Sequence, residues 1–71
     1  MAHYYLNTNQ QSNGDYEVHE QGCYWLTLVK TPEYLGNFTG CAAAVSNAKQ
    51  KHPTWYRING CMHCCPACHT T

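Results

Sequence analysis

Two aromatic-rich stretches near the start of the chain predict β-strands. Residues 3–6 (His-Tyr-Tyr-Leu) and residues 16–19 (Tyr-Glu-Val-His) hold aromatic and β-branched side chains, which fit a pleated, half-buried surface. The run from 7 to 15 between them is polar, and its Asn13-Gly14 pair tolerates the positive φ of a turn. We therefore predict that the two stretches pair as a hairpin with a loop longer than the tightest type.

The pattern then becomes less regular. Residues 25–29 are apolar or β-branched and predict an irregular strand or a buried turn, which Thr31-Pro32 ends. Residues 34–38 predict a short extended piece. Residues 55–58 predict a last strand, and Asn59-Gly60 predicts a turn before the end of the chain.

Helical spacing occurs in one segment. The alanine-rich run Cys41–Lys51 has apolar residues at positions 41, 44, 45 and 48 and lysines in its last turn. Thr39 is a candidate N-cap, and Pro53 stops the pattern. These segments predict a single α+β domain over residues 1–71, with a small hairpin or meander sheet and one helix at about 39–51.

Composition indicates that such a domain needs a staple. Aliphatic side chains are few, and six Tyr and two Trp supply much of the apolar mass among 71 residues. A core of this size is marginal by itself, because buried Tyr and Trp also need partners for their polar atoms. We therefore expect a metal or a covalent cross-link to stabilise the fold.

The charges are balanced in number and uneven in position. Residues 1–40 carry four acidic side chains against one lysine, whereas residues 41–71 carry three cations and no acid. Four cations in all are few for binding a phosphate backbone. The start of the chain has no secretory signal pattern and no stretch suited to a membrane. We expect a cytoplasmic monomer, whose clustered cysteines bind metal rather than form disulfides.

Four of the six cysteines lie in the run Cys61-Met-His-Cys-Cys-Pro-Ala-Cys68, which holds two overlapping Cys-x-x-Cys pairs. Zinc takes four thiolate or imidazole ligands in a tetrahedron, and a tight turn points both sulfurs of such a pair at one ion. The Cys65–Cys68 pair is favoured, because its proline pre-sets the turn. His19 and Cys23 supply the other two donors if Gly22 allows a sharp turn between them. We therefore predict one Zn²⁺ per chain, in a C-terminal zinc knuckle, held by His19, Cys23, Cys65 and Cys68.

Other ligands remain open. Cys61 and Cys64 are alternates, and His63 is a further one. Adjacent Cys64 and Cys65 do not easily serve one tetrahedral centre. Cys41, on the inner face of the predicted helix, is expected to be a small buried hydrophobe.

Three other chemistries compete with zinc. Cys65-Pro-Ala-Cys68-His69 matches the Cys-x-x-Cys-His pattern of haem attachment. A Cys-x-x-Cys pair can also perform thiol–disulfide exchange, although no helix follows this one to lower a thiol pKa. A secreted domain stapled by disulfides is the third alternative.

The order of Val18-His19-x-x-x-Cys23, an alanine-rich helix and Cys65-Pro-x-Cys68 resembles the small zinc-binding domain of the Ada type. That domain occurs in a DNA-alkylation repair protein and, in relatives, beside nucleases. The resemblance implies the fold and metal roles for His19, Cys23, Cys65 and Cys68. It does not extend to alkyl transfer, because basic residues are scarce and a histidine stands first among the ligands. The chain also looks like a group of short bacterial proteins ending in Cys-Cys-Pro-x-Cys-His-Thr, which implies no activity.

These observations predict a structural zinc domain without catalytic activity, because four protein ligands leave no place for a reactive water. We expect it to bind a protein partner through exposed aromatic side chains. The candidates are Tyr4, Tyr5, Trp25, Trp55 and Tyr56. The same rings could stack on single-stranded nucleic acid, which is the alternative binding class. A redox or metal-handling role is a further alternative.

Overall fold

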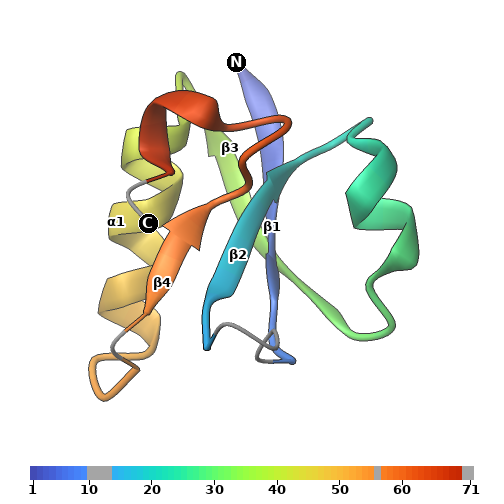
Figure 1. Ribbon diagram of the computed structural model, residues 1–71. Coiled ribbons are helices and arrows are strands. Elements are labelled where there is room, and N and C mark those ends of the chain that lie inside the picture. Colours follow the sequence, from blue (N-terminus) through green and yellow to red (C-terminus); the bar gives the residue numbers. More distant parts are fainter. Residues whose placement is uncertain (10–13, 56, 70–71) are drawn as a thin grey trace.

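The protein has an α+β fold, in which one α-helix packs against a four-stranded mixed sheet (Figure 1). A computed structural model describes residues 1–9, 14–55 and 57–69. The described elements are, in chain order, β1 (Ala2–Asn7), β2 (Tyr16–Glu20), the 3-10 helix η1 (Tyr24–Leu28), β3 (Pro32–Phe38), α1 (Cys41–Lys51), β4 (Ile58–Gly60) and the 3-10 helix η2 (Pro66–Cys68). The strand order is β3-β1-β2-β4. The predicted fold class is confirmed.

The N-terminal hairpin forms as predicted. β1 and β2 are antiparallel, with Tyr5 opposite His19 and Leu6 opposite Val18. β3 pairs with the other edge of β1, and the register shifts between Tyr4 and Tyr5. Gly14 has a φ of 95°, in keeping with its predicted place in a turn, whereas Asn13 lies outside the described residues.

The last strand differs from the prediction. Asn59 and Gly60 are the buried end of β4, not a turn, and β4 runs parallel to β2. A Cβ atom on Gly60 would lie 2.6 Å from Cys68 Cβ and 2.9 Å from the Cys65 carbonyl oxygen. Gly60 is therefore needed because another part of the backbone passes close to it, which is a common reason for glycine within a strand.

The hydrophobic core lies between the sheet and α1. Leu6 and Val18 from the sheet and Ala44 and Ala48 from α1 are all fully buried. The predicted inner face of the helix is confirmed. The prediction that Thr39 caps the helix is wrong. The N-cap residue is Gly40, which has no side chain to accept a hydrogen bond from the first turn. The small alanine side chains let the helix approach the sheet closely, but their burial removes little apolar surface from water.

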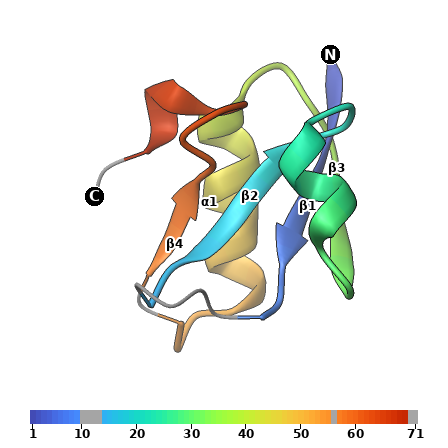
Figure 2. The same cartoon turned by 45° about the vertical axis from the view of Figure 1, so that its right-hand side comes forward.

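The segment after Cys23 is not a strand or a buried turn. Tyr24–Leu28 form the 3-10 helix η1, none of whose residues is buried. Both edges of β1 and of β2 already pair with other strands, so neither of these two strands offers an open edge to this segment. Figures 1 and 2 show η1 and α1 on opposite sides of the sheet.

The aromatic residues divide between core and surface. Tyr4 is 5% exposed and belongs to the core, so it does not form a partner surface. Trp55 stacks between Tyr16 and His52, at centroid distances of 4.1 and 3.8 Å. Trp25 is 42% exposed, and Tyr56 lies outside the described residues. Within the described part of the chain, every helix is too short or too polar to cross a membrane.

Candidate metal centre

Four side chains with metal-binding atoms meet at one end of the sheet. They are His19, Cys23, Cys61 and Cys64, and their ligand atoms all lie within 4.8 Å of one another. His19 is in β2, whereas Cys61 directly follows β4. Since these strands are parallel, with Val18 opposite Gly60, their carboxyl ends reach the same edge. Strand pairing therefore places the C-terminal cysteines beside the histidine.

A tight turn after β2 places Cys23 against His19. The Cys23 amide donates to the Glu20 carbonyl at 3.0 Å, and Gly22 has a φ of 94°, which favours glycine. Cys23 Sγ consequently lies 3.8 Å from His19 Nδ1. The sharp turn at Gly22 that the sequence predicts is present.

The Cys61–Cys64 pair forms the second half of the group. The chain turns at residues 62–64, and the Cys65 amide donates to the Cys61 carbonyl at 2.8 Å. The amide of His63 donates to Cys61 Sγ, and that of Glu20 donates to Cys64 Sγ, each at 3.4 Å. Cys64 Sγ lies 3.9 Å from His19 Nδ1. Amide donors aimed at sulfur favour the thiolate form.

This geometry fits a small tetrahedral ion. With Zn–S near 2.3 Å and Zn–N near 2.0–2.1 Å, two ligand atoms of a tetrahedron lie about 3.5–3.8 Å apart. The distances from His19 Nδ1 to the sulfurs of Cys23 and Cys64 are 3.8 and 3.9 Å. Only small movements are needed to bring the four atoms to coordination distance. Three thiolates and one imidazole are also a donor set that zinc accepts.

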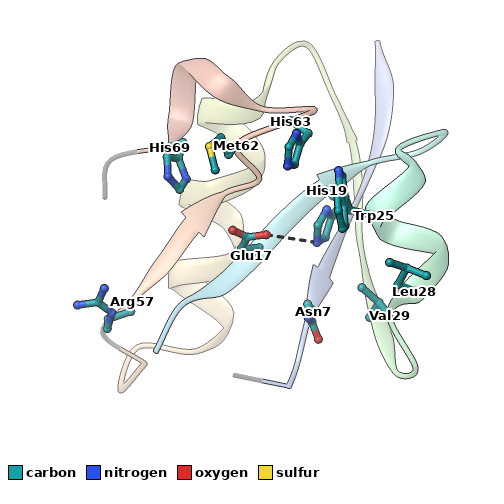
Figure 3. Close-up of a pocket in the computed structure, with 10 residues that line it drawn as sticks. All are labelled: Asn7, Glu17, His19, Trp25, Leu28, Val29, Arg57, Met62, His63 and His69. Atoms are coloured by element: carbon teal, nitrogen blue, oxygen red, sulfur yellow. Dashed lines mark ion pairs between the residues drawn. The ribbon is translucent and has the colours of Figure 1, made fainter. Parts of the chain in front are cut away.

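The surroundings of His19 favour its imidazole as a metal ligand. His19 is 1% exposed, and burial lowers its pKa, so the imidazole is neutral at neutral pH. Its Nδ1 faces the sulfurs, while its Nε2 lies 3.9 Å from Glu17 Oε1 (Figure 3). A carboxylate beside the second nitrogen orients a metal-binding histidine and increases its basicity.

Burial has the opposite effect on the thiols. It raises the pKa of Cys61 and Cys64, although the amide of His63 lowers that of Cys61. The nearby Cys23 sulfur raises the Cys61 pKa further. A cluster of thiols that resists ionisation by itself gains most from a cation, which replaces the protons and neutralises the repulsion.

The predicted ligands do not come together as one group. His19 and Cys23 lie with the alternates Cys61 and Cys64. Cys68 is joined to Cys41 in a disulfide. This bond corrects the prediction that Cys41 is a small buried hydrophobe, and it corrects for Cys68 the expectation that the clustered cysteines bind metal rather than form disulfides. Cys65 is 3% exposed, within the hydrophobic core.

The remaining alternate, His63, stands outside the group of four and stacks on Trp25, with ring centroids 4.8 Å apart. The signal that selects Cys61 was present in the sequence, since its Cys-x-x-Cys pair directly follows the last strand. It becomes decisive only once β4 is known to be parallel to β2.

A pocket of about 700 Å³ adjoins this centre on the sheet face away from α1 (Figure 3). We call it the sheet-face pocket. Its lining includes Glu17 and His19 from β2, Trp25 and Leu28 from η1, and Met62 and His63 from the C-terminal segment. The metal-binding group therefore joins the two segments that wall the pocket.

Comparisons with known proteins found no relative of this chain. No family model, curated protein or solved structure matches the chain. The resemblance to the Ada-type domain and to the short bacterial proteins therefore stays a prediction. The geometry and chemistry of four side chains in this chain support metal binding.

Proposed function

We propose that this protein is a small structural zinc domain that acts as a protein-binding module. The observation that carries the proposal is the group of His19, Cys23, Cys61 and Cys64, whose ligand atoms lie within 4.8 Å of one another. These four donors complete a tetrahedral shell. A closed shell leaves no position for a reactive water, so the metal stabilises structure and does not catalyse a reaction.

The ion would stabilise the end of the sheet where the turn after β2 meets the segment after β4. It would tie the turn after β2 to the segment after β4, which are 44 residues apart between Glu20 and Cys64. Among the described residues, the core holds four large aliphatic side chains, Leu6, Val18, Leu35 and Ile58, and small alanines supply part of the rest. Metal binding would therefore contribute directly to the free energy of folding.

A binding role is supported by the exposed side chains beside the centre. Trp25, Leu28 and Met62 are 42%, 57% and 56% exposed and all line the sheet-face pocket. Large exposed apolar side chains around a pocket are typical of a docking site. We favour a protein partner over nucleic acid, because the one Arg or Lys among the described lining residues, Arg57, pairs with Asp15 at 2.8 Å.

The deciding experiment measures zinc and free thiols on purified protein. We expect one zinc per chain by elemental analysis, and four thiols that react with a thiol reagent only after chelation, namely the three proposed ligands and the buried Cys65. Loss of the near-UV circular dichroism signal on chelation would show that the metal stabilises the fold. Protein without zinc, whose thiols react freely, would overturn the proposal.

Paired variants test which residues bind. Cys61→Ser is expected to lose zinc, because it removes one of four ligands. His63→Ala lies in the same turn, outside the group, and is expected to keep zinc. The opposite pattern would contradict this ligand set, as would zinc loss in Cys65→Ala with zinc retained in Cys61→Ser.

A further inference from the structure

The floor of the sheet-face pocket contains a carboxylate. Glu17 lies on β2, two residues before His19, and its side chain is 11% exposed. Figure 3 shows its carboxylate in the middle of the pocket, below Met62 and His69 and beside His19. A charged side chain held in a confined pocket is positioned to recognise a charge of opposite sign.

The surrounding charges favour a cation. Arg57 lines the far end of the pocket, but its Nε donates to Asp15 Oδ1 at 2.8 Å, and Asp15 is fully buried. The proposed metal centre beside the pocket would carry one net negative charge, because three thiolates surround a divalent ion. A phosphate would therefore meet charges of its own sign, whereas a cation would be attracted.

The walls suit a long side chain that ends in a flat cation. Trp25 stacks on His63 with an interplanar angle of 22°, and the indole remains 42% exposed. Leu28 and Met62 add apolar surface around it. An arginine side chain combines an aliphatic stem with a planar guanidinium, which stacks on aromatic faces and pairs with carboxylates through two N–H donors.

We propose that the sheet-face pocket binds an arginine side chain presented by a segment of a partner protein. The guanidinium pairs with the Glu17 carboxylate and lies against Trp25, and the stem contacts Leu28 and Met62. This inference rests on the proposed function, because the metal would hold the Trp25 and His63 walls in place. It names the chemistry by which the module recognises its partner.

The test is a titration of the whole protein, with its zinc content measured, against two short capped peptides. One peptide has a central arginine between glycines and alanines. The other carries citrulline, which has the same shape and no charge. Amide chemical shifts in NMR spectra report both the affinity and the place of binding. We expect the arginine peptide to bind about tenfold more tightly and to shift residues around Glu17 and Trp25.

Matched variants separate the pocket from the rest of the surface. Measured at saturating zinc, which offsets the weaker zinc binding expected when Glu17 no longer orients His19, Glu17→Gln and Trp25→Ala are each expected to weaken arginine binding by about fivefold or more. Glu33→Gln and Tyr34→Ala change a carboxylate and an exposed aromatic residue that do not line the pocket, and should bind as the native protein does.

Two failures are distinguishable. If zinc-loaded protein binds both peptides equally, or neither, the arginine proposal is overturned and the structural zinc proposal stands. If the protein is found to contain no zinc when purified and still binds the arginine peptide through Glu17, the pocket is supported and the metal proposal fails. Loss of binding in Glu33→Gln equal to that in Glu17→Gln would also overturn the pocket assignment.

Discussion

At the scale of single residues, His19 links the two halves of the centre. One ring nitrogen faces Cys23 and Cys64, and the other faces Glu17. The ring is 1% exposed, so its orientation is set by packing as well as by these polar contacts. A ligand held in one orientation before the ion arrives loses little conformational entropy on binding.

Replacing this ring removes a ligand and leaves a cavity. We expect His19→Ala to bind no zinc at stoichiometric concentration and to lose at least about 2 kcal/mol of unfolding free energy. The measurements are elemental analysis and urea unfolding in zinc-containing buffer. His3→Ala, which removes an exposed histidine bonded to the Tyr34 hydroxyl, should keep its zinc. A His19→Ala protein with full zinc would exclude the imidazole as a ligand.

The protonation states predict how zinc affinity changes with pH. Burial raises the pKa of Cys61 and Cys64 and lowers that of His19. Zinc must therefore displace protons from the thiols but none from the neutral histidine near pH 7. Affinity should fall as pH falls, with about three protons released per zinc rather than four. Calorimetry in buffers of different ionisation enthalpy counts these protons, and a release near zero would exclude thiolate ligation.

At the scale of elements, the parallel pairing of β2 and β4 creates the centre. Each strand ends beside a ligand, His19 in β2 and Cys61 after β4. The Cys61 amide donates to the Val18 carbonyl at 2.9 Å, so the ladder continues up to the ligand itself. An antiparallel β4 would have carried its last residue to the opposite edge.

The close approach at Gly60 makes β4 sensitive to a single methyl group. An added Cβ would lie 2.6 Å from Cys68 Cβ and 2.9 Å from the Cys65 carbonyl oxygen, so the backbone of one segment must move. We expect Gly60→Ala to cost about 1–3 kcal/mol of unfolding free energy in urea. At Gly40, where a Cβ would meet nothing within 4 Å, the same change should cost less than about 1 kcal/mol. Equal costs would contradict the crowding at Gly60.

Local patterns predicted the elements whose causes are local. The alanine spacing of Cys41–Lys51 and the alternation of Tyr16–Glu20 each reflect contacts that the segment itself dictates. β4 could not be predicted in this way, because Asn59-Gly60 favours a turn by itself, and only the C-terminal backbone packed against it requires the glycine. The prediction that Cys65 and Cys68 bind the metal rested on the turn that the proline between them favours. It missed that strand pairing brings Cys61 beside His19.

At the scale of the whole molecule, the C-terminal segment is held to the domain twice. The Cys41–Cys68 disulfide ties it to the start of α1, on one side of the sheet. The proposed metal centre ties it to the turn after β2, near η1 (Figure 2). Two cross-links on opposite sides suit a domain whose core is small.

These two cross-links are expected to act independently. The disulfide joins residues separated by 27 positions, and a loop of this length contributes about 3–4 kcal/mol in the chain-entropy description. The double variant Cys41→Ala, Cys68→Ala should lose about that much unfolding free energy and still bind one zinc, because neither sulfur belongs to the metal group. Urea unfolding and elemental analysis measure the two effects on the same sample. Cys61→Ala, by contrast, should keep the disulfide and lose the zinc. If the double variant lost its zinc while remaining folded, the Cys41 or Cys68 sulfur would have to be a ligand, and the metal centre would have to be assigned again around α1.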